Sequence, residues 1–187
     1  MLSLILKEDT RTSHQQLEKQ VVQRLKAITN KADYADFLKH FYAYFHAVEQ
    51  AIAPYITPQV LPDYAQRRHA SFLKADLETL GSTSDDLPAA TAPTIATTVE
   101  ALGALYVMEG SIMGGSIIVK MLEKVGITEG ISFFSGYGPA TGSMWKTFTE
   151  VLNAQGRTEA DEAQAVAAAN ETFTRFGDVF VENRVTE

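Results

Sequence analysis

The spacing of apolar residues along the chain is helical almost throughout. Leu17, Val21 and Leu25 recur at every fourth position in the first segment, and similar spacing continues toward the C-terminus. No stretch alternates apolar and polar residues in the way that predicts a half-buried strand. The pattern therefore predicts an all-α fold, a multi-helical bundle that forms a single domain over residues 1–187.

Capping and breaker residues divide this pattern into about six helices. Asn30 closes the first helix and Asp33 is the expected N-cap of the second, which ends before Pro54. Gly81 closes the third helix and Gly126 the fourth. The expected helices cover about residues 3–28, 33–53, 62–80, 94–125, 140–154 and 159–183.

The composition narrows the classes of function. The chain has no cysteine, which excludes disulfides, thiolate metal sites, iron–sulfur clusters and cysteine nucleophiles. A net charge of −7 argues against binding to nucleic acid or to an anionic membrane surface. Neither a signal peptide nor a run of about 18 apolar residues is recognisable. We therefore expect a cytoplasmic protein without a membrane span.

One histidine lies on a helix face that combines cations with aliphatic residues. His14 precedes Leu17 and Val21 by three and seven positions, and Arg11 and Lys7 come one and two turns before it. A histidine on an apolar stripe is most often a core residue. The preceding cations also suit a planar apolar ligand with carboxylates, such as haem, for which neutral histidine is the commonest axial base.

The other histidines show no comparable pattern. His40 and His46 fall in an aromatic-rich helix and are expected to be core or surface residues, whereas His69, beside Arg67 and Arg68, is expected to be solvated. A di-iron carboxylate site needs a glutamate three residues before a histidine, and no histidine of this chain has one. The motifs of zinc proteases, P-loops, dinucleotide folds and nucleophile elbows are absent as well.

Three glycines interrupt the most apolar helix, in the stretch YVMEGSIMGGSII. Gly110, Gly114 and Gly115 should each weaken the helix by about 1 kcal/mol relative to alanine. Their spacing is compatible with close helix packing. It is equally compatible with a backbone surface cleared for a flat ligand, with Met113 adding adaptable apolar contact.

Two later segments add candidates. The helix that follows the glycine-rich loop carries Lys146, a candidate for a second carboxylate contact. Phe173, Phe176 and Phe180 share one face of the last helix and are predicted to be core residues, one of which can also line a pocket.

Three segments together resemble the bacterial, biliverdin-producing branch of the haem oxygenase family. LKEDTRTSHQQLE resembles the proximal-helix signature, GALYVMEGSIMGG resembles the distal helix, and FFSGYGPATGSMWKTF is similar to a segment typical of bacterial members. They occur in the family's order and span about residues 6–148.

The resemblance implies that haem, as cofactor and substrate, lies between the first helix and the glycine-bearing helix. Its reaction uses O2 and electrons from a separate reductase or ferredoxin to open the ring to biliverdin, with release of Fe2+ and CO. Both supply of bilin to a phytochrome-type photoreceptor and release of iron stay open as its purpose. The implied site residues are the iron ligand His14, the distal residues Gly110, Ser111, Met113, Gly114 and Gly115, and the propionate contacts Lys7, Arg11 and Lys146.

Ser111 departs from the mammalian-type pattern of this family, in which an aspartate follows the first distal glycine and organises catalytic water. A serine can hold a water molecule but carries no charge, and Glu109 is expected to point to another side of the helix. The departure keeps a non-enzymatic haem carrier or sensor on the same fold as an alternative. A thiaminase-like bundle would require a cysteine, and a structural bundle without a ligand would not use His14.

Overall fold

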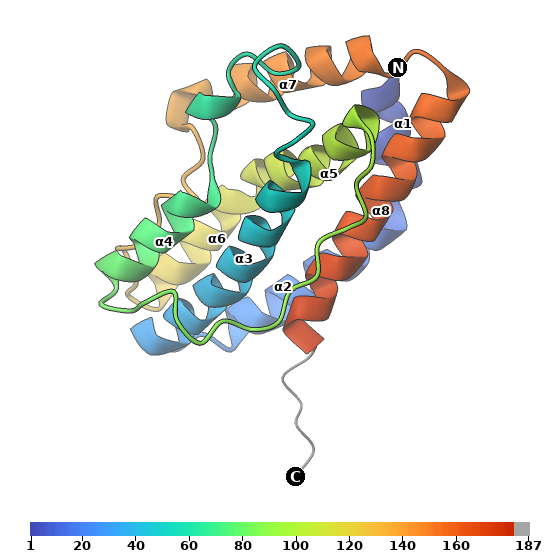
Figure 1. Ribbon diagram of the computed structural model, residues 1–187. Coiled ribbons are helices and arrows are strands. Elements are labelled where there is room, and N and C mark those ends of the chain that lie inside the picture. The colour runs from blue at the N-terminus through green and yellow to red at the C-terminus, as the bar shows by residue number, and fades with distance from the viewer. Residues whose placement is uncertain (182–187) are drawn as a thin grey trace.

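Residues 1–181, the part of the chain that the structure describes, form eight α-helices and two short 3-10 helices in a computed structural model (Figure 1). No strand occurs among these residues, so the predicted all-α class is confirmed. In chain order the elements are α1 (Leu2–Asp9), α2 (Arg11–Lys26), α3 (Lys31–Ile52), η1 (Tyr64–Gln66), α4 (Ala70–Thr79), α5 (Thr98–Gly110), α6 (Ile112–Lys124), η2 (Gly138–Ala140), α7 (Thr141–Gln155) and α8 (Glu159–Val181).

Helix α8 is the central packing partner of the bundle. Its most extensive packing is against α5, and it also contacts α1, α2 and α3. An aromatic cluster fills the centre, where the Phe41 ring meets Phe176 edge-on at 5.0 Å and Tyr44 stacks on Phe176 at 4.7 Å. Phe173, Phe176 and Phe180 are all buried, which confirms their assignment to the core.

Thr10 interrupts the helix that the sequence predicts as continuous over 3–28. Its hydroxyl donates to the Leu6 carbonyl at 2.6 Å, and its backbone departs from helical angles at φ −106° and ψ 4°. A hydroxyl that bonds the preceding turn competes with the helix ladder. The prediction is therefore wrong at this point, and the break puts Lys7 on α1 and both Arg11 and His14 on α2.

The glycine-bearing helix is also broken, in contrast to the predicted single span of 94–125. It begins at α5 with a capping box, in which Thr97 and Glu100 satisfy each other's backbone N–H groups. It breaks at Ser111, whose hydroxyl donates to the Met108 carbonyl at 2.6 Å. A hydroxyl bonds a carbonyl three or four residues back at both breaks, but Thr172 makes the same bond inside the unbroken α8, so this bond alone does not end a helix.

Two further predicted boundaries are corrected. Asn30, not Asp33, is the N-cap of α3, because the Asn30 side chain accepts the Asp33 N–H while the Asp33 carboxylate bonds Thr29. The predicted helix over 62–80 is the short η1 followed by α4, because the backbone at Arg67 is extended, with φ −81° and ψ 164°. The expected end of the last helix, at residue 183, lies outside the described residues.

The stretch Thr98–Lys124 is long and apolar enough to cross a membrane by length and mean hydropathy alone. The same property is ordinary for a core helix, and 56% of its most apolar window is buried in the bundle. The stretch is therefore only weak evidence for a membrane span.

Candidate functional site

His14 lies near the start of α2 and is held by two contacts. Its imidazole Nε2 is 3.2 Å from the Glu18 carboxylate, one turn later, and its ring stacks on Phe173 of α8 at 5.2 Å. The side chain is nevertheless 54% exposed, so His14 is not a core residue. The alternative of a satisfied core histidine is therefore wrong. Sequence reasoning missed Glu18, which the i, i+4 spacing could have indicated.

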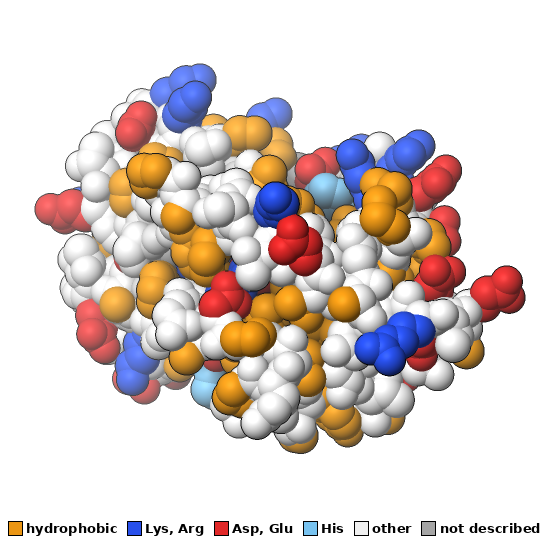
Figure 2. Space-filling view, turned by 90° about the horizontal axis from the view of Figure 1, so that it is seen from above, with side chains coloured by type: hydrophobic (Ala, Val, Ile, Leu, Met, Phe, Trp, Pro, Cys, Tyr) orange, Lys and Arg blue, Asp and Glu red, His pale blue; other side chains and the backbone are white. Residues whose placement is uncertain are grey.

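The predicted cations are exposed on neighbouring helices. Lys7 on α1 and Arg11 on α2 form no ion pair with any described residue, and Lys146 on α7 is only within 3.9 Å of Glu150. Helix α1 packs against α7, where the Ser3 N–H donates to the Asn153 side chain. Figure 2 shows Lys and Arg side chains along the upper edge of the molecule, with Asp and Glu side chains among them.

The three glycines face different surroundings. A Cβ at Gly114 would meet nothing within 4 Å, and one at Gly110 would make only an ordinary 3.7 Å contact with the Trp145 indole. A Cβ at Gly115 would instead collide with the Phe134 carbonyl. Gly115 thus faces the protein interior, which corrects the expectation that all three glycines share one ligand face. Packing within the protein accounts for Gly115 but not for Gly110 or Gly114.

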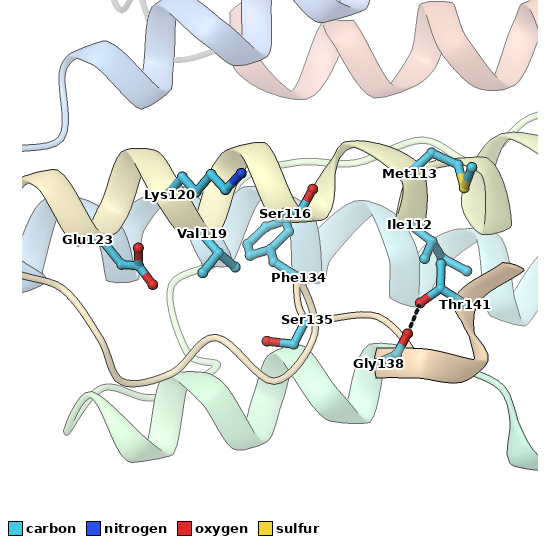
Figure 3. Close-up of a pocket in the computed structure, with 10 residues that line it drawn as sticks. All are labelled: Ile112, Met113, Ser116, Val119, Lys120, Glu123, Phe134, Ser135, Gly138 and Thr141. Carbon is cyan, nitrogen blue, oxygen red and sulfur yellow. Dashed lines mark hydrogen bonds between the residues drawn. The ribbon is translucent and has the colours of Figure 1, made fainter.

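Apolar side chains surround the bare backbone of Gly114. Met113 is 57% exposed and Ile117, one turn after Gly114, is 62% exposed. In Figure 3, α4 lies on one side of α6 while α2 and α8 lie on the other. The outer surface of α6 therefore combines exposed apolar groups with a helix backbone that no protein atom covers at Gly114.

An aromatic pair borders the same surface at Gly110. Trp145, the only tryptophan of the chain, packs beside Tyr106 with 5.7 Å between the ring centroids. Tyr106 lies one turn before Gly110, and burial raises the pKa of its phenol. Sequence reasoning did not select either residue, although Trp145 lies in a segment that carries the family resemblance.

A buried network of charged side chains includes Glu109, which precedes the break between α5 and α6. Arg67 donates to the carboxylates of Asp63 and Glu109, at 2.8 Å in each case, and the Tyr137 hydroxyl donates to Glu109 at 3.0 Å. Arg67, Arg68 and Glu109 are all buried. The basic residues next to His69 are therefore not part of a solvated surface.

His69 itself is half-buried rather than solvated. Its imidazole is 3.4 Å from the Glu49 carboxylate, and its other nitrogen lies 2.9 Å from the Tyr64 carbonyl. The hydrogen bond to Glu49 raises the pKa of His69 above its ordinary value.

Ser111, the residue expected to replace a catalytic aspartate, is held by the protein itself. Its hydroxyl donates to the Met108 carbonyl at 2.6 Å and accepts from the Arg68 guanidinium at 2.8 Å. Arg68 also donates to the Phe133 carbonyl at 2.9 Å.

A pocket of about 520 Å³ lies on another flank of α6, between that helix and the loop that leads into α7 (Figure 3). Ile112, Val119 and Phe134 form its apolar part, and Lys120 and Glu123 stand at its edge. None of Gly110, Gly114 or His14 lines it. Met113, which is exposed beside Gly114, also lines the pocket, so the pocket adjoins the open glycine surface.

Comparisons with known proteins agree with this architecture. A family model described as Heme oxygenase matches residues 1–182. A heme oxygenase of Xanthomonas campestris is 34% identical over 114 residues, which cover 59% of this chain and 66% of that protein. The heme oxygenase PigA of Pseudomonas aeruginosa is 27% identical over 172 residues, which cover 91% of this chain and 86% of that protein.

Solved structures extend the comparison to the fold. The NO- and CO-bound heme oxygenase of Neisseria meningitidis superposes with a TM-score of 0.84 at 26% identity, over 97% of this chain and 91% of that one. Heme oxygenase-1 of Synechocystis sp. PCC 6803, in complex with heme, shares the fold with a TM-score of 0.74 at 18% identity, over 97% of this chain and 91% of that one.

The fold and the site define a helical bundle with features that suit a planar, iron-containing ligand. It contains a half-exposed histidine, a residue type that serves as an axial base of haem, and two glycines that leave room that a Cβ would occupy. The residues present therefore fit haem. The chain belongs to the haem oxygenase family.

Proposed function

We propose that the chain binds haem between α2 and α6 and degrades it with O2 to biliverdin, Fe2+ and CO. The observation that carries the proposal is the pair Gly110 and Gly114, whose missing side chains no contact within the protein requires. Membership of the haem oxygenase family supports degradation, and no feature of the structure favours a haem carrier or sensor.

His14 is the proposed iron ligand. Because Nε2 lies 3.2 Å from the Glu18 carboxylate, this contact orients the imidazole, and the ring nitrogen that does not contact Glu18 would bind the iron. The stack on Phe173 fixes the plane of the ring. Haem, when bound, supplies both the iron at which O2 is activated and the ring that is cleaved.

Cationic side chains are proposed to bind the propionates of haem, and apolar side chains are proposed to contact its ring. Lys7, Arg11 and Lys146 are proposed to bind the propionates, since all three are exposed on helices around the site. Met113 and Ile117 would contact the ring and exclude water from it, because both are exposed apolar side chains close to Gly114 in the sequence of α6. Ser111 is kept close to the glycines by its bonds to Met108 and Arg68.

The proposal also includes the electron donor of the reaction and the location of the protein. A reductase or ferredoxin supplies electrons, and the protein acts in the cytoplasm without binding a membrane or nucleic acid. The net charge of −7 supports the last point.

The test is to add hemin to the purified protein, record its spectrum, and then add a reductant under air. Degradation predicts loss of the Soret band together with the appearance of biliverdin and CO. A carrier would instead keep its haem spectrum under the same conditions and form no bilin. A His14→Ala variant should lose the spectrum of histidine-ligated haem while keeping the helical content of the parent.

A further inference from the structure

Arg68 links three parts of the molecule from a buried position. It follows η1 and precedes α4, and only 6% of it is exposed. Its guanidinium donates to Met108 and Ser111 at the α5–α6 break and to Phe133 in the loop before α7. The same guanidinium lies over the Phe133 ring at 4.0 Å. Through these hydrogen bonds the buried guanidinium connects the break between α5 and α6 to the loop that contains Phe133.

Arg68 donates to the Met108 carbonyl, which would accept a backbone hydrogen bond if α5 and α6 formed one continuous helix. In an unbroken helix the Met108 carbonyl would accept the N–H of Ile112, four residues later. Here it accepts the Ser111 hydroxyl at 2.6 Å and Arg68 Nη2 at 3.2 Å. The Gly114 N–H reaches back only three residues, to the Ser111 carbonyl. Arg68 and Ser111 together therefore account for the break.

The position of the charge also suits this role. The C-terminal end of a helix carries a partial negative charge and favours a cation. Arg68 lies at the end of α5, where its two bonds to Met108 and Ser111 replace backbone donors. Without it, the buried Phe133 carbonyl would lose the guanidinium that donates to it.

The break has a consequence for the proposed haem surface. Gly110 is the last residue of α5 and Gly114 lies in the first turn of α6, so the break falls between the two glycines. The angle between α5 and α6 thus sets how the two bare backbone segments face the same ligand.

On the basis of the proposed function, we infer that Arg68 is a positioning residue for haem cleavage. It fixes the α5–α6 break, and thereby the direction from which Gly110 and Gly114 meet the ring. That direction determines which meso carbon lies under the least obstructed part of the distal surface. Arg68 would act through Met108, Ser111 and Phe133, to which its guanidinium donates, and not by binding the ligand itself.

The experiment compares Arg68→Lys and Ser111→Ala with the parent, and uses Arg24→Lys as the control. Lysine keeps the charge of Arg68 but lacks the planar fork that reaches two acceptors. Ser111→Ala removes the hydroxyl without removing the cation. Arg24 bonds Asp36 and His40 and is remote in sequence from the break.

The first measurement is amide hydrogen exchange of the ligand-free proteins over residues 106–118. Loss of one charge-assisted hydrogen bond predicts exchange at least about tenfold faster there in Arg68→Lys, and a smaller change in the same direction in Ser111→Ala. Arg24→Lys should keep the parent exchange in this stretch. Parent-like exchange in a folded Arg68→Lys protein would overturn the inference. If Arg68→Lys does not fold, the exchange of Ser111→Ala tests the inference, and parent-like exchange over residues 106–118 in that variant would overturn it.

The second measurement is the ratio of biliverdin isomers formed from haem, separated by chromatography. Arg68→Lys and Ser111→Ala should change this ratio, whereas a residue that only supports the fold would lower the yield without changing the isomers. An unchanged ratio together with faster exchange would contradict the role in positioning. If the parent protein itself forms no bilin, the proposed function fails, and hydrogen exchange still tests whether Arg68 holds the break.

Discussion

Alanine substitution of neighbouring glycines separates a ligand surface from a packing surface. In the ligand-free protein a Cβ at position 114 meets nothing within 4 Å. Alanine is favoured over glycine inside a helix by about 1 kcal/mol, so Gly114→Ala should stabilise the protein by about that amount. For a chain of this size, the gain corresponds to a rise of about 2–4 °C in Tm. The same methyl group would project onto the proposed haem surface and weaken haem binding.

Gly115→Ala provides the matched control one residue later. Its Cβ would collide with the Phe134 carbonyl, a backbone atom that a change of rotamer cannot move. Overpacking of this kind destabilises by about 1–3 kcal/mol, so the gain in helix propensity should be lost and Tm should fall. Gly110→Ala, with an ordinary 3.7 Å contact to Trp145, should keep or raise the stability of the ligand-free protein.

Thermal unfolding of the ligand-free variants and titration with hemin measure the two effects. We expect Gly114→Ala to have a higher Tm and a lower affinity for hemin than the parent. A variant that gains stability and still binds and degrades haem as the parent does would refute the assignment of Gly114 to the haem surface.

Three further predictions concern other parts of the site and the core. The double variant Lys7→Gln/Arg11→Gln should bind hemin about two- to fivefold more weakly for each exposed ion pair lost, and the difference from the parent should shrink in high salt; equal affinities at low salt would exclude propionate binding by these cations. Emission of Trp145, the only tryptophan, should be quenched when hemin binds, and unquenched emission at saturation would place haem away from Gly110. Burial holds the pKa of His40 below its ordinary 6.5, so the unfolded chain binds this proton more readily, and the contribution of His40 to the free energy of unfolding should fall as pH drops below about 6.5. A His40→Gln variant, which keeps a hydrogen-bonding partner for Arg24, should show a weaker decline when urea unfolding is measured from pH 7 to pH 5, and an identical decline would refute this reasoning.

Apolar periodicity was sufficient to predict the helical class, since every predicted helix corresponds to a helical segment of the structure. The helix interruptions that the pattern did not predict lie at Thr10, Ser111 and Arg67. In the first two, a hydroxyl bonds a carbonyl of the preceding turn, and the apolar pattern does not reveal that choice. At Arg67 the chain leaves helical angles where its guanidinium meets Glu109, which is 42 residues away in the sequence.

The sequence predicts the part of the candidate site that depends on local helix spacing, but not the part that depends on tertiary packing. Arg11, His14 and Glu18 follow one another at spacings of three and four residues on α2, a local pattern that the sequence reveals, whereas the break at Thr10 puts Lys7 on α1. Gly114 and Gly115, in contrast, are adjacent and look alike in the sequence. Only the loop that brings the Phe134 carbonyl against α6 distinguishes them, and that contact is a property of tertiary packing.

The most direct test of the proposed function is a single-turnover reaction of the hemin-loaded protein with a reductant under air, followed by absorption and by detection of CO. The proposal predicts that the Soret band disappears while biliverdin and CO form, and that the His14→Ala variant lacks this reaction. A parent protein that keeps its Soret band and releases neither biliverdin nor CO would contradict it.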